Sequence, residues 1–253
     1  MPSTLVPILT YHSIDPSGSV LSVAPADFRE HMCSLARNGF TGIRFDRLIG
    51  AFEGRVALPP RPVVLTFDDA YANFQEAALP ALREFGFSAT VFAVAGLVGK
   101  TNDWPGQGLS IPRLPLLDWP ALREIASSGF EIGSHTFSHA RLDCTSPDRL
   151  EYEIAGSRRR LEDGVGAPVA TFAYPYGAHH PASVALARAH YRGACTTRMA
   201  TARVAHDRHL LPRLDVYYLR DPLRFARLGT PIGGAYLAMR AMGRAARTLL
   251  VRS

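Results

Sequence analysis

The chain has 253 residues, of which 47% are hydrophobic and 20% are charged, so it can bury a large core, and general disorder is excluded. The net charge is +6, but no run of Lys or Arg alternates with aromatic residues, and we expect no nucleic-acid partner. We also expect no secretion signal and no transmembrane segment, because no apolar run reaches the roughly 18 residues that span a bilayer.

Strand-like and helix-like segments alternate along most of the chain. Short apolar runs predict strands over residues 5–10, 41–45, 62–67, 88–94, 129–133, 169–174, 193–197 and 211–217. Longer amphipathic runs predict helices over residues 25–38, 73–85, 118–128, 147–162 and 181–190. Such alternation is typical of parallel strands joined by crossover helices. It predicts an α/β fold, a distorted (β/α)7–8 barrel with its site at the C-terminal ends of the strands.

The C-terminal segment differs from the rest of the chain, and we predict a barrel over residues 1–230 followed by a basic helix over residues 231–253. Arg240, Arg244 and Arg247 recur there at helical spacing. Two interpretations of this segment stay open. It is either an outer helix packed on the barrel or, through residues 231–252, an amphipathic helix in peripheral contact with a membrane.

The three cysteines are far apart in the sequence and include no C-x-x-C pair. They are Cys33, Cys144 and Cys195. We interpret them as reduced thiols, which predicts a cytoplasmic protein, located at the inner membrane face if the C-terminal helix binds lipid.

Two short segments carry the residues that suggest catalysis. Asp68 and Asp69 directly follow the apolar run 62–67, and His135 and His139 follow another predicted strand. Each pair alone also fits a helix cap or a solvated surface. Together they provide one carboxylate and two imidazoles, a common ligand set for a catalytic divalent metal ion. The remaining carboxylate is a candidate base for a metal-activated water.

On these motifs the chain resembles the polysaccharide deacetylases, carbohydrate esterase family four, over roughly residues 5–217. Two matching segments are Thr66-Phe67-Asp68-Asp69 and Ser134-His135-Thr136-Phe137-Ser138-His139. Phe172-Ala173-Tyr174-Pro175-Tyr176-Gly177 matches the third motif in its Pro-Tyr-Gly part. The resemblance implies a metal-dependent hydrolase that removes acetyl groups from an N-acetylated sugar or polysaccharide. An O-acetyl esterase and a non-catalytic carbohydrate-binding barrel are the alternatives, and the basic C-terminus raises a lipid-linked substrate as a further hypothesis.

The resemblance also implies roles for individual residues. Asp68 is the implied catalytic base, and Asp69, His135 and His139 are the implied metal ligands. Zn²⁺ fits this set best, although Co²⁺, Ni²⁺ or Fe²⁺ also fit. A backbone N–H near Tyr176 is the implied oxyanion donor.

The chain departs from the family pattern at two places. Ala173 stands where the third motif usually has a base-orienting Arg, and no strand after residue 217 carries the usual general-acid His. His12 ends an apolar strand at the N-terminus. Because the first and last strands of a closed barrel are neighbours, a circular permutation would place His12 where the missing His belongs. Arg213 is a candidate replacement for the missing Arg, or else it forms a structural ion pair.

Three aromatic residues and one acid complete the candidates. Tyr174, Tyr176 and Trp104 could stack on sugar rings or pack at the edge of the core. Trp104 lies in a segment rich in Gly and Pro, residues 100–115, which we interpret as a rim or lid. Glu131 is either a partner of a ligand histidine or an inward-facing polar residue.

Overall fold

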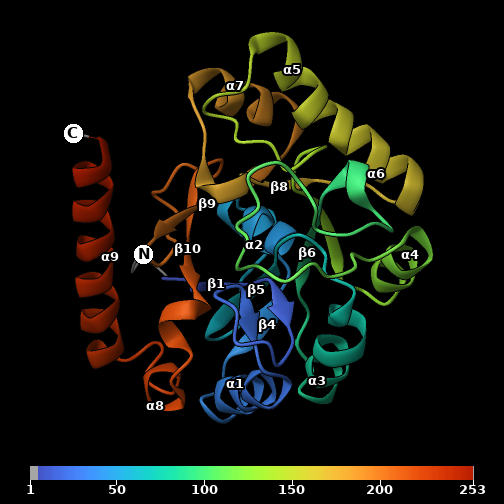
Figure 1. Ribbon diagram of the computed structural model, residues 1–253. Coiled ribbons are helices and arrows are strands. Elements are labelled where there is room, and N and C mark those ends of the chain that lie inside the picture. Colours follow the sequence, from blue (N-terminus) through green and yellow to red (C-terminus); the bar gives the residue numbers. More distant parts are fainter. Residues whose placement is uncertain (1–4, 253) are drawn as a thin grey trace.

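A barrel of parallel strands forms the centre of the molecule (Figure 1). The computed structural model describes residues 5–252, with side chains up to residue 243. Within this part seven strands close the barrel in the order β1-β10-β9-β8-β7-β6-β5, because β1 pairs with both β10 and β5. They are β1 (Ile8–Tyr11), β5 (Pro62–Phe67), β6 (Thr90–Ala93), β7 (Glu131–Ser134), β8 (Thr171–Ala173), β9 (Gly193–Met199) and β10 (Leu211–Asp215). The predicted α/β barrel is confirmed.

Three further strands lie outside the closed ring. β4 (Thr41–Ile43) pairs with the first residues of β5. β2 (Ser13–Ile14) and β3 (Ser22–Val23) form a separate two-stranded sheet that the sequence analysis did not predict. The central strand β5 is buried at all six positions, as expected for a parallel strand that is covered on both faces.

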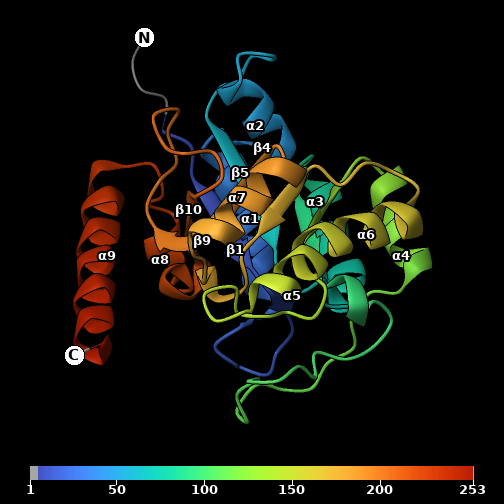
Figure 2. The same ribbon diagram turned by 90° about the horizontal axis from the view of Figure 1, so that it is seen from above.

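Helices surround the barrel on its outer side (Figures 1 and 2). They are α1 (Pro25–Arg37), α2 (Phe45–Phe52), α3 (Leu79–Glu84), α4 (Trp119–Ser127), α5 (Pro147–Glu151), α6 (Ser157–Val165), α7 (Pro181–His190) and α8 (Pro222–Phe225). Two of the predicted helices contain a π-helical turn: η1 (Phe74–Ala78) precedes α3, and η3 (Tyr152–Gly156) joins α5 to α6. Short 3-10 turns are η2 (Ala95–Leu97), η4 (Pro175–Gly177) and η5 (Val216–Leu219).

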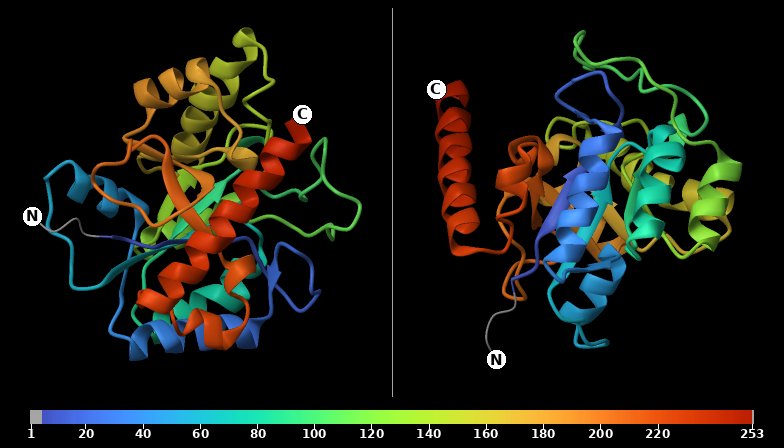
Figure 3. Two further views of the ribbon diagram at one scale, coloured as in Figure 1. Left: turned by 90° about the vertical axis from the view of Figure 1, so that its left-hand side faces the viewer. Right: turned by 90° about the horizontal axis from the view of Figure 1, so that it is seen from below.

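The last helix, α9 (Pro231–Arg252), lies along the outside of the barrel near β9 and β10 (Figures 1 and 3). Tyr236 and Leu237 on its first turns are partly buried against the core. Among the described residues no helix is long and apolar enough to cross a membrane. The side chains of Arg244 and Arg247 lie outside the described set, and the division into two domains stays a prediction.

Candidate active site

The C-terminal ends of the strands bring the predicted residues to one place. Asp68 and Asp69 follow β5, and the Asp68 N–H donates to the Tyr11 carbonyl at the end of β1 (2.9 Å). His135 follows β7, and its N–H donates to the carbonyl of Ala93 on β6 (2.9 Å). The closed barrel therefore holds both acidic and imidazole segments against neighbouring strand ends.

Asp69, His135 and His139 form a buried group whose possible ligand atoms all lie within 4.8 Å of one another. The Nε2 atoms of His135 and His139 lie 3.5 and 3.2 Å from Asp69 Oδ1. The His135 Nδ1 lies 2.7 Å from the carbonyl of Ala173 and can donate to it only as N–H, which leaves Nε2 with a free lone pair. The three possible ligand atoms therefore lie together rather than beside separate partners.

This donor set fits a divalent metal ion. Asp69 Oδ1 is buried and has no hydrogen-bond donor of suitable geometry among the described residues, which is unusual for a buried carboxylate. Burial lowers the pKa of His135 to about 4, so its imidazole is neutral and able to act as a ligand at pH 7. Two imidazoles and one carboxylate are ligands that Zn²⁺ and related ions accept.

The second carboxylate, Asp68, is held by Arg213. The two terminal guanidinium nitrogens of Arg213, Nη1 and Nη2, donate to Oδ1 and Oδ2 of Asp68 at 2.7 Å each. Arg213 also donates to the Thr196 carbonyl (3.0 Å) and to the Thr66 hydroxyl (3.2 Å). Both members of the pair are buried. Because Arg213 lies on β10 and Asp68 follows β5, this pair depends on barrel closure through β1.

The charge of Arg213 controls the ionisation of Asp68. Burial alone would raise the pKa of Asp68, but Arg213, followed by His135, outweighs burial and holds that pKa well below its usual range. Asp68 is therefore ionised at neutral pH, and each of its oxygens keeps a lone pair that can accept a further proton.

His12 also lies close to Asp68. Its Nε2 lies 4.0 Å from Asp68 Oδ2, and the side chain is partly exposed. β1, which precedes His12, pairs with β10 and β5. The expected adjacency of the first and last barrel strands is confirmed, and it places His12 at the edge of the site.

Trp104 and Tyr176 enclose His139. Their ring centroids lie 4.1 and 4.8 Å from that of His139. Trp104 is almost completely buried, whereas much of the Tyr176 ring is exposed. Trp104 is thus positioned to cover a candidate metal ligand, and Tyr176 presents its ring at the surface of the site.

The structure corrects the prediction for Tyr174. Its side chain is completely buried and packs edge-on against Phe172, with ring centroids 5.0 Å apart. The ring therefore has no surface available for a sugar. The other interpretation, an aromatic residue packed at the edge of the core, describes Tyr174.

Backbone strain is concentrated around the site. Six non-glycine residues among those described have φ in the left-handed region, and five of them lie in the site loops: Asp69, Ala70, Thr136, His139 and Tyr176. Such conformations persist only where the surrounding structure enforces them, and they are frequent in active sites.

A buried acid that was not predicted from the sequence supports the loop that carries His135 and His139. Glu153, on the π-helical turn η3, accepts hydrogen bonds from the N–H groups of Phe137 and Ser138 (3.0 and 2.9 Å) and from the Ser138 hydroxyl (2.7 Å). A signal was present: Glu153 lies between Leu150 and Ile154 on the apolar face of its helix. An acid at such a position needs buried donors.

Glu131 does not contact a ligand histidine. Its carboxylate lies inside the barrel, where it accepts hydrogen bonds from the hydroxyls of Thr90 and Thr171 and from the N–H of Asp46. The second interpretation, an inward-facing polar residue, is therefore confirmed.

Comparison with known proteins agrees with this site. The family model for polysaccharide deacetylase matches residues 55–193. YxkH of Bacillus subtilis (strain 168), which is named for the same family, is 26% identical over 212 residues, covering 83% of this chain and 71% of YxkH. The poly-β-1,6-N-acetyl-D-glucosamine N-deacetylase of Escherichia coli (strain K12) is 29% identical over 137 residues, which are 51% of this chain and only 20% of that enzyme.

Solved structures share the fold. The polysaccharide deacetylase BC0361 from Bacillus cereus is 27% identical, with a TM-score of 0.70 over 85% of this chain and 65% of that chain. The Streptococcus pyogenes deacetylase PplD, solved in complex with acetate, is 24% identical, with a TM-score of 0.74 over 84% of this chain and 92% of that chain. The family match spans more than half of the 253 residues and includes Asp68, Asp69, His135 and His139. The chain belongs to the polysaccharide deacetylase family.

Proposed function

We propose that this chain is a metal-dependent deacetylase that hydrolyses the acetamide of an N-acetylated sugar or polysaccharide. One observation carries the proposal. The buried group of Asp69, His135 and His139, which could hold a metal ion, lies directly beside the ionised carboxylate of Asp68. The N-deacetylase activity named for the Escherichia coli relative supports an amide substrate.

Asp69, His135 and His139 would hold the ion. When bound there, a divalent metal acidifies a water molecule and polarises the acetyl carbonyl. Zn²⁺ suits two imidazoles and one carboxylate, and Co²⁺, Ni²⁺ and Fe²⁺ are the other candidates.

Asp68 acts as the general base in this proposal. It is ionised because Arg213 lowers its pKa, so it can accept the proton of the attacking water. The bidentate contact with Arg213 fixes the plane of the carboxylate, which keeps a lone pair directed at the site.

His12 acts as the general acid. It is near enough to Asp68 for both to reach one substrate, with 4.0 Å between His12 Nε2 and Asp68 Oδ2. Collapse of the tetrahedral intermediate requires a proton on the departing amine nitrogen, and the protonated imidazole of His12 provides it. We further propose the backbone N–H near Tyr176 as a donor to the developing oxyanion.

Acetate release tests the proposal. The purified protein is incubated with N-acetylated chitooligosaccharides and with O-acetylated xylan, with and without a chelator, and acetate and bound metal are measured. We expect chelator-sensitive release from the N-acetylated substrate. We also expect Asp68→Asn to lower turnover at least 10²-fold with metal content unchanged.

The other outcomes separate the alternatives. Release from the xylan alone would identify an O-acetyl esterase. No release from either substrate by protein that contains stoichiometric metal would identify a non-catalytic carbohydrate-binding barrel.

A further inference from the structure

The positive charge of the protein is concentrated at its C-terminal end. Residues 216–253 contain seven Arg and one acid, Asp221. Their excess of six positive charges equals the net charge of the whole chain, +6, so residues 1–215 are electrically balanced. After Asp221 no acidic residue occurs. Alternating charges of both signs are typical of a solvent-exposed helix, and this segment lacks them.

One face of α9 packs on the rest of the molecule. Gly233, Leu237 and Ala241 are spaced four residues apart, Gly233 is buried, and Leu237 and Ala241 contact the core. The Tyr236 hydroxyl donates to the Tyr218 carbonyl (2.9 Å). A Cβ on Gly233 would meet the Arg227 carbonyl oxygen at 2.1 Å, so the start of α9 is closely packed on the chain that leads into it.

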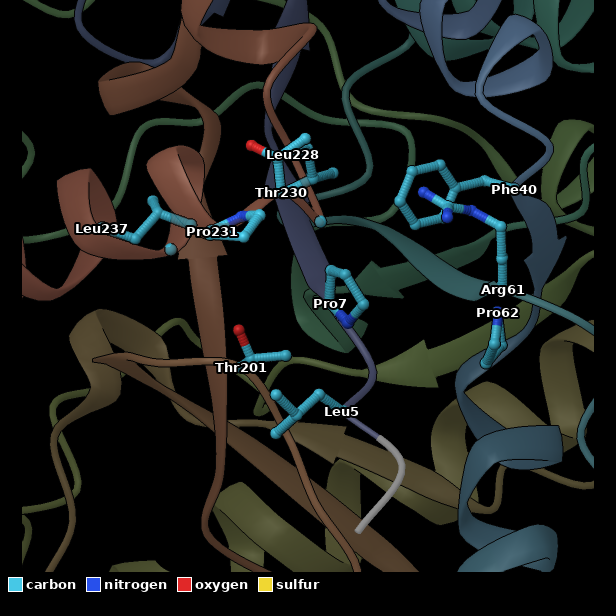
Figure 4. A pocket seen from close by; sticks show the side chains of 12 residues that line it. Leu5, Pro7, Phe40, Arg61, Pro62, Thr201, Leu228, Thr230, Pro231 and Leu237 are labelled. Carbon is cyan, nitrogen blue, oxygen red and sulfur yellow. The ribbon is translucent and has the colours of Figure 1, made fainter. Parts of the chain in front are cut away.

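The packing beneath α9 is incomplete. A cavity of about 470 Å³ separates the first turns of α9 from the barrel. Figure 4 shows Leu237 and Pro231 on one side of it and Phe40 with Arg61 on the other, with Pro7 between them. The helix therefore rests on the barrel through part of its inner face only.

The opposite face of α9 is apolar and uncovered. Ile232, Met239 and Met242 are 65%, 56% and 67% exposed. Their spacing of seven and three residues places them on one side of the helix. In the left view of Figure 3 α9 crosses in front of the strands, and no other described element lies over it. Leu223, on the neighbouring α8, is also exposed.

Exposed arginines occur on the same C-terminal segment as this apolar stripe. Arg224, Arg227 and Arg240 are exposed, and none of them forms an ion pair among the described residues. Arg224 and Arg240 lie over the rings of Tyr236 and Tyr218. We call Leu223, Ile232, Met239 and Met242 with these three arginines the C-terminal surface.

We infer that the C-terminal surface binds the face of an anionic lipid bilayer. A bilayer of this kind accepts both parts of the surface, because apolar side chains enter the headgroup boundary while Arg pairs with lipid phosphates. A second copy of the chain would bring arginines against arginines. A nucleic acid would pair with the arginines but would leave Ile232 and the methionines in water. This inference goes beyond the proposed function and does not depend on it.

Vesicle co-sedimentation of the full chain tests the inference. The probes are phosphatidylcholine vesicles with and without about one third phosphatidylglycerol. We expect binding at least tenfold tighter to the anionic vesicles, and weaker binding as salt is raised. Met239→Glu with Met242→Glu should weaken binding about tenfold or more. Arg227→Gln with Arg240→Gln should lower the ratio of binding to anionic over neutral vesicles about tenfold.

Matched variants control for charge and folding. Val56→Glu with Val204→Glu introduces the same acids at exposed apolar positions elsewhere, and Arg47→Gln with Arg159→Gln removes the same charge elsewhere. Both should bind vesicles like the wild type. Thermal unfolding and acetate release from a soluble substrate, measured for every variant, should match the wild type, which separates this inference from the proposed function.

Three results would overturn the inference. The first is equal binding to neutral and anionic vesicles, or no binding to either. The second is equal loss of binding in the control and test variants. The third is a dimer in analytical ultracentrifugation that Met239→Glu with Met242→Glu dissociates, since that would make the surface an interface between copies.

Discussion

Two acidic side chains stand next to each other at the end of β5, and each finds a different counter-charge. Asp69 faces the imidazoles of His135 and His139, whereas Asp68 is clamped by Arg213. Adjacent carboxylates would otherwise repel one another and raise each other's pKa. In the proposed mechanism, this division lets Asp69 serve as a metal ligand while Asp68 stays ionised and serves as the base.

The Arg213–Asp68 pair leads to a prediction about pH. Arg213→Gln removes the charge that opposes burial, so the pKa of Asp68 should rise. Since Asp68 must be ionised to act as a base, the acidic limb of the kcat profile should move to higher pH, with turnover reduced at least 10²-fold at neutral pH. The variant should also lose about 3–5 kcal/mol of stability, because a buried carboxylate is left unpaired.

The profile is measured from acetate release between pH 4 and 9. Arg213→Lys keeps the positive charge, so its acidic limb should stay close to the pH of the wild-type limb. Arg192→Gln, which breaks the Arg192–Glu53 ion pair away from the site, is the control and should leave the profile unchanged. An unmoved acidic limb in Arg213→Gln would show that Arg213 is only structural.

His12 leads to a prediction about the leaving group. A general acid matters for a departing amine and hardly at all for a good leaving group that departs as an anion. His12→Ala should therefore lower hydrolysis of the acetamide by 10²–10⁴-fold and that of p-nitrophenyl acetate far less. Metal content is measured alongside and should not change, because His12 is outside the ligand group. Equal falls for both substrates would rule out the general-acid role.

At the scale of elements, the strands were predictable because they are short apolar runs buried on both sides, as β5 shows. The helix α2 was missed, although Phe45, Leu48 and Ile49 have helical spacing, because its eight residues give too short a window for periodicity. The strands β2 and β3 have two residues each and carry no pattern. The π-helical turns were also invisible, since one extra residue per turn does not alter the hydrophobic period enough.

One of these π-helical turns has a consequence for the site. η3 carries Glu153 into contact with the loop between His135 and His139, where it accepts three hydrogen bonds and pairs with Arg149. Both Thr136 and His139 in that loop have positive φ. We attribute the persistence of this strained loop largely to the buried carboxylate of Glu153.

Glu153→Gln should therefore weaken metal binding. A Gln side chain can accept fewer hydrogen bonds than a carboxylate, so the loop should relax and the two imidazoles should converge less often. Support of this kind is typically worth 10–100-fold in metal affinity. Titration of metal-free protein with Zn²⁺ in a calorimeter measures it, and Glu151→Gln, at an exposed position two residues away, is the matched control. The same dissociation constant in both variants would contradict this role.

At the scale of the whole molecule, the site depends on closure of the barrel. The candidate ligands Asp69, His135 and His139 could be predicted because the Asp68–Asp69 pair and the His135–His139 pair each form a local motif after one strand. The clamp of Arg213 on Asp68 joins residues 145 positions apart, and no local pattern encodes it. The sequence suggested this clamp only because Ala173 stands where the third motif of the family usually has a base-orienting Arg. The same holds for Glu153, whose partners are fixed by how a helix packs on the barrel.

Barrel closure also buries an acid that should make stability depend on pH. Glu131 bonds to Thr90 on β6 and Thr171 on β8, and burial, followed by the charge of Asp46, raises the pKa of Glu131 from 4.5 to about 7. Between these pH values the folded protein binds more protons than the unfolded chain, so this group makes stability fall as pH rises.

Glu131→Gln removes that titration while keeping hydrogen-bonding groups in place. The free energy of unfolding of the wild type minus that of the variant should therefore fall between pH 4.5 and 7, by about 3 kcal/mol at most, and then stay constant. Urea unfolding at a series of pH values measures this difference and cancels the titration of other buried groups, such as His31. Glu76→Gln, at an exposed acid on η1, should show a constant difference. A wild-type minus Glu131→Gln difference in unfolding free energy that is equally constant would contradict this prediction. It would mean that the carboxylate of Glu131 has the same pKa in the folded and unfolded chains, so burial in the barrel would not raise that pKa.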